Sequence, residues 1–272
     1  MTKSKGTILL IHGFPETSYQ FRHVITPLAD AGYHIIAPDY RGAGHSSHPR
    51  NGYDKFTMAA DLHALLTEHL DIRDKVHVVG HDIGGMVAAA YAMKFPEHTA
   101  SVAWGECPLP GSRAYDRTVV EEAYGGTWHF IFHWQIDLPE MLVDTPDKVR
   151  LYIKSFYDRL CRVSMAIGLE DIDYYTTVFS QPGAMRSAFD VYRAFHQDAE
   201  DNKKWLKDNG KSKVPCMMLS GDGSFLKGIA EDEGNEFFES VDVQTVEGSG
   251  HWIAEERPEA FVEVVKEWVG KH

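Results

Sequence analysis

The feature that most constrains the fold of this chain is a glycine-rich turn at residues 80–85, which read Gly-His-Asp-Ile-Gly-Gly. The apolar run Val-His-Val-Val precedes it at residues 76–79, and the run Met-Val-Ala-Ala-Ala-Tyr follows it. This pattern predicts a buried strand, a tight turn and a helix, with the side chain of Asp82 at the apex. A carboxylate there can attack an electrophilic sp³ carbon and become an ester, but it cannot form the acyl-enzyme that a serine forms.

Composition narrows the class of protein. The chain has 272 residues, enough for one large α/β domain or for a core with an inserted segment. Its formal net charge of −13 disfavours nucleic acids and anionic membranes as partners, because both would repel it. Cys107, Cys161 and Cys216 lack metal-binding spacing, so we expect reduced thiols in a cytoplasmic protein. We also expect no secretory leader and no membrane span.

Strand patterns alternate with helical patterns along most of the chain, which predicts a mainly parallel sheet covered by helices on both faces. The predicted strands are residues 7–11, 34–37, 75–79, 99–104, 214–219 and 241–246. The predicted helices outside the middle of the chain are residues 17–31, 56–70, 83–95 and 258–269.

The middle of the chain interrupts this alternation. More than a hundred residues separate the strands expected at 99–104 and 214–219, which is too many for a loop. They hold a dense aromatic stretch at residues 124–134, followed by amphipathic helical patterns. We therefore predict an inserted helical cap, or lid, at residues 109–211 and an α/β core formed by residues 1–108 and 212–272.

Three further motifs accompany the turn. They read His-Gly-Phe-Pro at residues 12–15, Asp-Tyr-Arg-Gly-Ala-Gly-His-Ser at residues 39–46 and Gly-His-Trp at residues 250–252. Together with the turn, and in this order, they resemble the motifs of the α/β-hydrolase superfamily, and within it those of the epoxide hydrolases. The resemblance covers nearly the whole chain except the first strands of the usual sheet. Either the sheet is naturally shortened, with an exposed edge that invites pairing with a second copy, or the given sequence is incomplete.

The resemblance assigns roles to two residues. Asp82 is expected to be the nucleophile. The non-catalytic alternative is an aspartate that caps the helix start or forms an ion pair there. His251 is expected to be the general base that activates the water hydrolysing the ester, rather than one of many structural histidines.

The histidine also needs an acidic partner, and two candidates exist. Glu106, in the segment Glu-Cys-Pro-Leu-Pro, matches relatives with a Glu-x-Pro-x-Pro segment in which this Glu is the acid. Asp222 lies after the strand expected at 214–219, but two residues before the position that many relatives use, which is Ser224 here. We favour Glu106 and keep Asp222 in reserve.

The backbone N–H groups of Phe14 and Ile83 are expected to form an oxyanion hole. The resemblance also implies a cis peptide bond between Phe14 and Pro15.

Opening an epoxide leaves an alkoxide, so the cap must offer it a proton or a hydrogen bond. The family usually supplies two tyrosines. Here Trp-His-Phe at residues 128–130 resembles the subclass with a lid histidine, His129, and Tyr192 matches the second tyrosine. The alternatives in the cap are Tyr152, Tyr157, Tyr174 and Tyr175. His129 and His133 have the i,i+4 spacing of a metal pair, but no third ligand is in pattern, so we predict no metal and no cofactor.

The sequence thus predicts an epoxide hydrolase that acts with water on small apolar epoxides. Haloalkane and fluoroacetate-type haloacid dehalogenases share the Asp nucleophile and are the alternative. By resemblance, the former hold halide with a Trp beside the nucleophile, and the latter need arginines there and a Trp after the lid histidine. The chain has Ile83, Met86 and Phe130 at these positions. A non-catalytic ligand-binding homologue is the second alternative.

Overall fold

The computed structural model describes residues 4–121 and 127–272. Within these residues, six strands form one sheet in the order β2-β1-β3-β4-β5-β6, and every neighbouring pair is parallel. The strands are β1 (Thr7–Ile11), β2 (His34–Ile36), β3 (Val76–His81), β4 (Thr99–Gly105), β5 (Cys216–Gly221) and β6 (Val241–Val246). The predicted parallel α/β architecture is confirmed.

The boundaries of β1 and β6 match the prediction, whereas β5 begins two residues later than expected. Pro215 lies at this point, and a proline has no N–H group for the hydrogen-bond ladder of a central strand. Its carbonyl still accepts a hydrogen bond from the N–H of Val102 at 2.9 Å. Within the described residues no strand precedes β1, and β2 forms one edge of the sheet.

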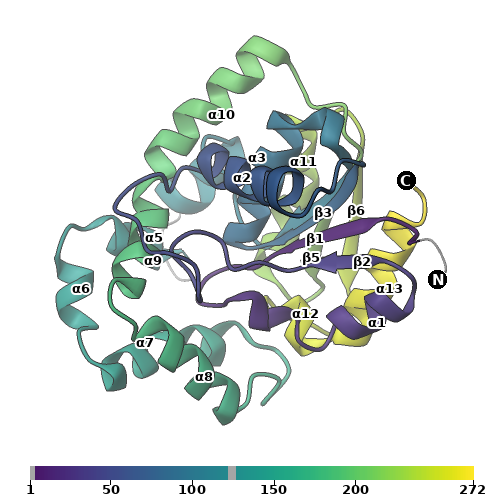
Figure 1. Cartoon of the computed structure of the whole chain (residues 1–272). Helices are drawn as coiled ribbons and strands as arrows, with labels where there is room; N and C mark the ends of the chain where they lie inside the picture. Colours follow the sequence, from purple (N-terminus) through teal and green to yellow (C-terminus); the bar gives the residue numbers. More distant parts are fainter. Residues whose placement is uncertain (1–3, 122–126) are drawn as a thin grey trace.

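Both faces of the four central strands β1, β3, β4 and β5 are buried, as expected for parallel strands, whereas the edge strands β2 and β6 are partly exposed. In β1, Leu9 and Ile11 pack into one apolar cluster, whereas Ile8 and Leu10 pack into a second cluster. Figure 1 shows α2, α3 and α11 on one face of the sheet and α1 and α13 on the other. These layers and their short connections comprise η1 (Ser18–Phe21), α1 (Ile25–Asp30), α2 (Lys55–Ala64), η2 (Leu65–His69), α3 (Ile83–Lys94), η3 (Pro96–His98), η5 (Phe225–Ile229), α11 (Ala230–Phe237), α12 (Ile253–Glu256) and α13 (Pro258–Val269).

One predicted helix is wrong in extent. The segment expected to be helical at residues 17–31 is divided into η1 and α1. Pro27 explains the division, because proline lacks the N–H that would bond to the residue four positions earlier and fits only the first turn of a helix. Accordingly α1 begins at Ile25, so that Pro27 lies in its first turn.

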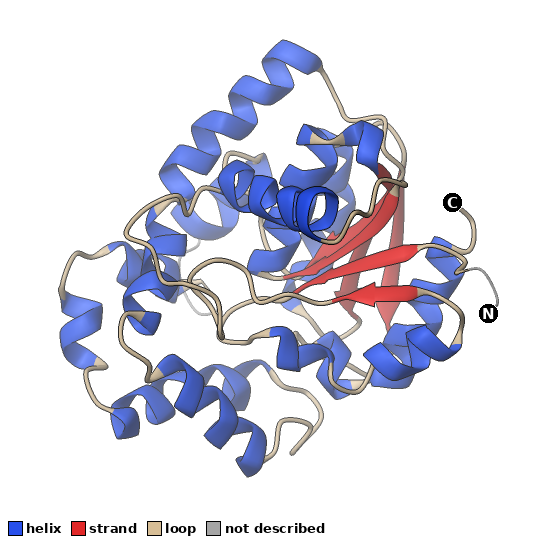
Figure 2. Cartoon of the chain, viewed as in Figure 1, coloured by secondary structure: helices blue, strands red, loops and turns tan. Residues whose placement is uncertain are grey.

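The described residues between β4 and β5 form helices and loops but no strand (Figure 2). Most of these helices gather beyond the carboxyl ends of the strands. The helices are α4 (Arg113–Tyr115), η4 (Asp116–Glu121), α5 (Trp128–Trp134), α6 (Leu138–Leu142), α7 (Pro146–Leu160), α8 (Leu169–Phe179), α9 (Ala184–Arg193) and α10 (Phe195–Asn209). The first residues of the aromatic stretch, 124–126, lie outside the described part. None of the described helices is long and apolar enough to cross a bilayer.

A buried ion pair joins this helical segment to the sheet layers. The ammonium of Lys55, at the start of α2, lies 2.7 Å from the carboxylate of Asp198 on α10. Their side chains are 2% and 1% exposed. Lys55 also donates through Nζ to the carbonyl of Val191 on α9 at 3.0 Å. Removing one partner of such a pair leaves an uncompensated buried charge, which typically costs about 3–5 kcal/mol.

Candidate active site

Asp82 lies between β3 and α3, in the tight turn that the sequence predicts. Its backbone has φ 53° and ψ −124°, a conformation that non-glycine residues rarely adopt. The turn is possible because the residues two positions before and after Asp82 are glycines. A Cβ on Gly84 would lie 2.1 Å from the carbonyl oxygen of Ile11, and one on Gly80 would lie 2.1 Å from that of Gly84. The chain therefore holds Asp82 at the carboxyl end of the central strand β3.

The carboxylate of Asp82 faces the two backbone N–H groups predicted for the oxyanion hole, those of Phe14 and Ile83. The N–H of Phe14 donates to Oδ1 at 2.8 Å, and the Phe14–Pro15 peptide bond is cis, as expected. Burial raises the pKa of Asp82. Nearby His251 and His81 oppose this rise, as do hydrogen bonds from the N–H groups of Phe14 and Ile83.

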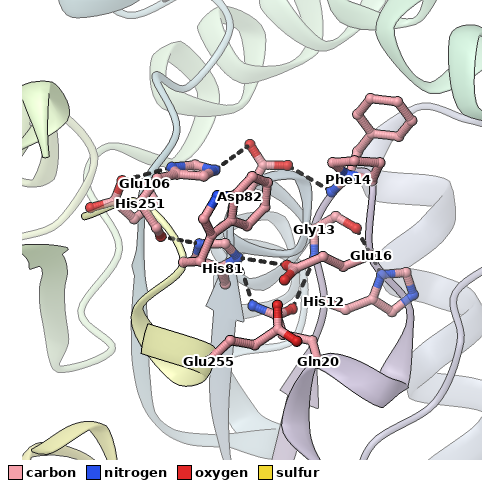
Figure 3. Close-up of polar contacts among 12 residues, drawn as sticks. His12, Gly13, Phe14, Glu16, Gln20, His81, Asp82, Glu106, His251 and Glu255 are labelled. Atoms are coloured by element: carbon pink, nitrogen blue, oxygen red, sulfur yellow. Dashed lines mark hydrogen bonds and ion pairs between the residues drawn. The ribbon is translucent and has the colours of Figure 1, made fainter. Parts of the chain in front are cut away.

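His251 lies in the loop between β6 and α12, next to Asp82 (Figure 3). Its Nε2 is 3.9 Å from Asp82 Oδ2, and its Nδ1 is 2.8 Å from Glu106 Oε2. Because Nδ1 donates to a carboxylate, Nε2 carries the lone pair that faces the nucleophile. Burial lowers the pKa of His251 to about 3, with His81 adding to the effect, so the imidazole is neutral at neutral pH.

Glu106, directly after β4, is held by two further donors. The N–H of Gly221 donates to Oε1 at 2.8 Å, and the hydroxyl of Ser224 donates to Oε2 at 2.7 Å. Burial raises the pKa of Glu106 to about 7, and the two hydrogen bonds oppose this rise. Asp222, the reserve candidate, instead accepts hydrogen bonds from the N–H of Gly248 at 2.9 Å and from Arg162 at 2.6 Å.

The two cap residues named as proton donors lie close to each other. His129 on α5 lines the same cavity as Asp82 and His251. Tyr192 on α9 is buried, and its ring centroid lies 5.6 Å from that of His129 and 5.6 Å from that of Phe14. The empty space between the lining residues of this cavity is about 370 Å³, part of which is open to solvent. Its lining is Phe14, Asp82, Glu106, Pro108, Thr127, His129, Phe130, Phe156, Leu160, Phe225, Leu226, His251 and Trp252.

The alternative tyrosines make other contacts. The hydroxyl of Tyr157 donates to the carbonyl of Pro15 at 2.6 Å, and that of Tyr175 donates to Glu255 at 3.2 Å. The ring of Tyr174 stacks on Tyr19 with 4.1 Å between centroids.

Tyr152 is also engaged, because its hydroxyl lies 2.6 Å from Nε2 of His133. The ring of His133 lies 5.5 Å from that of His129, the other member of the i,i+4 pair.

A buried polar network that could not be predicted from the sequence lies beneath the nucleophile (Figure 3). The Nε2 of His81 lies 2.7 Å from the carbonyl oxygen of His251, and its Nδ1 lies 2.8 Å from Gln20 and 3.3 Å from Glu16. Glu16 is fully buried next to a second buried carboxyl, that of Glu255. The sequence offers only their positions as a signal for this network, because His81 directly precedes Asp82 and Glu16 follows the His-Gly-Phe-Pro motif.

Glu16 should make the stability of the protein depend on pH. Burial raises its pKa from 4.5 to about 8, so between these values the unfolded chain loses this proton before the folded chain does. Stability therefore falls as the pH rises through this window. The variant Glu16→Gln has no carboxyl group that can ionise at this position. We therefore expect the melting temperature of the variant minus that of the wild type to be about 3–6 °C larger at pH 8 than at pH 5. Differential scanning fluorimetry at the two pH values measures this, and a difference that does not change with pH would contradict it.

Comparison with known proteins places the chain in a family. A family model described as the alpha/beta hydrolase fold matches residues 6–104. The soluble epoxide hydrolase of Corynebacterium sp. (strain C12) is 33% identical over 260 residues, covering 94% of this chain and 87% of that protein. Epoxide hydrolase A of Mycobacterium tuberculosis (strain ATCC 25618 / H37Rv) is 29% identical over 284 residues, covering 92% and 86%.

A solved structure agrees with these relatives. The epoxide hydrolase CorEH without ligand superimposes with a TM-score of 0.86 at 29% identity, covering 99% of this chain and 93% of that one. The similarity to these proteins agrees with the parallel sheet and with the turn that holds Asp82. The chain belongs to the α/β-hydrolase superfamily, and within it to the epoxide hydrolase family.

Proposed function

We propose that this protein is an epoxide hydrolase that opens a small apolar epoxide to a vicinal diol through a covalent ester on Asp82. The observation that carries the proposal is a buried carboxylate at the apex of the turn, facing both His251 and an apolar cavity. The relatives named epoxide hydrolases support the same activity.

In the first step, Asp82 Oδ2 attacks an epoxide carbon, so a carbon–oxygen bond to the carboxylate forms while the bond from that carbon to the ring oxygen breaks. The ring oxygen becomes an alkoxide and takes a proton from a cap donor. We assign this role to His129 and Tyr192, whose rings lie next to each other and, for His129, in the wall of the cavity. The product of the step is a hydroxyalkyl ester of Asp82.

In the second step, His251 Nε2 takes a proton from water, and the water oxygen attacks the ester carbonyl. Glu106 stabilises the resulting imidazolium through its hydrogen bond to Nδ1. The N–H groups of Phe14 and Ile83 face the tetrahedral oxyanion. Collapse expels the diol oxygen, which takes the proton of the new carboxyl group and leaves Asp82 ionised. The proton held by His251 returns to the cap donor, so water and epoxide together give the diol.

The composition of the cavity wall favours an epoxide over a haloacid. Among the described residues that line it, none is Lys or Arg, so the wall has no cation to bind a substrate carboxylate. Ile83 and Met86, at the positions where the family comparison would require arginine, are fully buried apolar side chains.

A substrate panel tests the proposed activity. We expect the purified protein to convert styrene oxide to its diol and to release no halide from fluoroacetate or chloroacetate. Chromatography of the diol and an ion-selective electrode for halide provide the measurements. Halide release without diol formation would indicate that the substrate is a haloacid rather than an epoxide. The absence of both products would favour a non-catalytic binding protein.

We also propose the division of the chain into a core (1–108 and 212–272) and a helical cap (109–211). All six described strands lie in the proposed core, which supports the division. The three cysteines are free thiols, which supports a cytoplasmic location. The edge of β2, which no strand among the described residues pairs with, offers a surface for contact with a second copy of the chain.

A further inference from the structure

Glu256, the last residue of α12, binds two separate loops through one buried carboxylate. Its Oε1 accepts hydrogen bonds from the N–H groups of Gly250 and Trp252, each at 3.0 Å. These residues flank the catalytic-base candidate His251. Its Oε2 accepts hydrogen bonds from the N–H groups of Arg162 and Val163 at 2.7 and 2.8 Å. The residue is 4% exposed, so few of these contacts are shared with solvent.

The loop at residues 161–163 follows α7 in the proposed cap, and Leu160, the last residue of α7, contacts His251 directly. The N–H of His251 donates to the carbonyl of Leu160 at 3.2 Å. The two loops touch so closely that a Cβ on Gly250 would lie 2.5 Å from this carbonyl oxygen. Because Leu160 and Phe156 line the cavity, the same stretch of cap meets both the substrate space and the backbone of His251.

We propose that Glu256 is a positioning residue that fixes the loop of His251 to residues 160–163 of the cap and thereby sets the imidazole for the attack of water on the ester. This inference rests on the proposed function. Glu256 does not touch Asp82 in the structure, so its effect is expected on the hydrolysis step rather than on the alkylation step. A misplacement of about 1 Å in a catalytic group can cost about 100-fold in rate.

The four donors explain why a carboxylate is needed. Two carboxylate oxygens provide enough lone pairs to accept all four N–H groups. A glutamine has the same shape but only one oxygen, so its NH₂ group would face two N–H donors of one of the loops. Those two donors would then be buried without an acceptor, which is costly in a closed site.

Glu233 offers a matched control. It is also buried and also binds the proposed cap, because its Oε1 accepts hydrogen bonds from the N–H of Leu109 and, at 3.0 Å, from the hydroxyl of Ser112. It lies on α11 in the proposed core and binds the first residues of the insertion, and no described hydrogen bond joins it to the loop of His251. Glu233→Gln therefore weakens the anchoring of the cap without acting on the base.

The test compares Glu256→Gln, Glu233→Gln and the wild type with styrene oxide. Rapid-quench intact mass spectrometry gives the rate at which the ester on Asp82 forms and the rate at which it disappears. We expect Glu256→Gln to slow hydrolysis of the ester by about 10–100-fold, with alkylation changed by less than about threefold, so that the ester becomes the main species at steady state. Glu233→Gln should keep the wild-type ratio of the two rates.

A second variant covers the case in which Glu256→Gln does not fold. Gly250→Ala forces the two loops apart at the carbonyl of Leu160 while leaving the carboxylate intact, and it should also slow hydrolysis selectively. Hydrogen exchange gives a readout that does not depend on activity. Peptides covering residues 160–163 and 250–252 should exchange faster together in Glu256→Gln and not in Glu233→Gln.

Two results would overturn the inference. One is that alkylation and hydrolysis slow by the same factor, and do so in both the Glu256 and the Glu233 variants, which would indicate a structural role only. The other is faster exchange at one loop without the other. Failure of the proposed function looks different, because the wild type itself would then form neither diol nor ester while the exchange experiment could still succeed.

Discussion

Replacement of Asp82 by asparagine is expected to lower kcat/KM for styrene oxide by at least about 10⁴-fold, because an amide is a far weaker nucleophile than a carboxylate. Asparagine has the shape of aspartate and its carbonyl oxygen can still accept the N–H of Phe14, so the turn should be retained. Diol formation under first-order conditions gives the measurement.

The control for this variant is its melting temperature, which should stay close to that of the wild type. Its mass must also be checked, since hydrolysis of the new amide would regenerate the carboxylate and restore activity. A complementary experiment uses the wild type in water enriched in ¹⁸O. Single turnover should place heavy oxygen in the carboxyl group of Asp82, because water attacks the ester carbonyl. An unlabelled Asp82 together with a labelled diol would show direct attack of water on the epoxide.

Replacement of His251 by glutamine is expected to separate the two chemical steps. The amide cannot take a proton from water, so hydrolysis of the ester should slow by about 10²–10⁴-fold. Alkylation should continue, because Asp82 needs no base to become nucleophilic. Intact mass spectrometry should therefore find a stable adduct equal in mass to the epoxide, and peptide mapping should locate it on Asp82.

This result requires that no group other than His251 activates water for hydrolysis of the ester. The matching variant Asp82→Asn carries His251 unchanged and should show no adduct, which links the added mass to the nucleophile. An unmodified His251→Gln protein that still produces diol would contradict the two-step scheme.

Much of the site could be predicted because its residues lie in short motifs at the ends of predicted strands. The turn around Asp82 could be predicted from its glycines, and the structure shows why they are needed: a side chain on Gly80 would clash with Gly84, and one on Gly84 would clash with the end of β1. In the sequence, only family resemblance favours Glu106 over Asp222, and in the structure it is Glu106 that contacts His251. His129 and Tyr192 have no local signature beyond their neighbours, so their assignment as donors stays a prediction.

Contacts between residues far apart in the sequence could not be predicted. Glu256 follows His251 by five positions, but nothing local indicates that residues 162 and 163 will donate to it. Glu16 and Glu255 are ordinary acidic residues in the sequence, and only the packing of η1 against α12 buries them together. Hydrophobic periodicity likewise predicted one continuous helix over residues 17–31, although Pro27 was a visible local signal against it.

The ion pair between Lys55 and Asp198 limits how this fold can be recombined. Lys55 belongs to the sheet layers, whereas Asp198 belongs to α10. A chimaera that receives its helical insertion from a relative would therefore bury the Lys55 ammonium without a counter-charge, unless that relative also has an acid at the position of Asp198. Because Lys55 bonds to the carbonyl of Val191, such a mismatch would also disturb the residue beside Tyr192. Exchange of substrate range by swapping insertions should therefore succeed only between parents that share both residues.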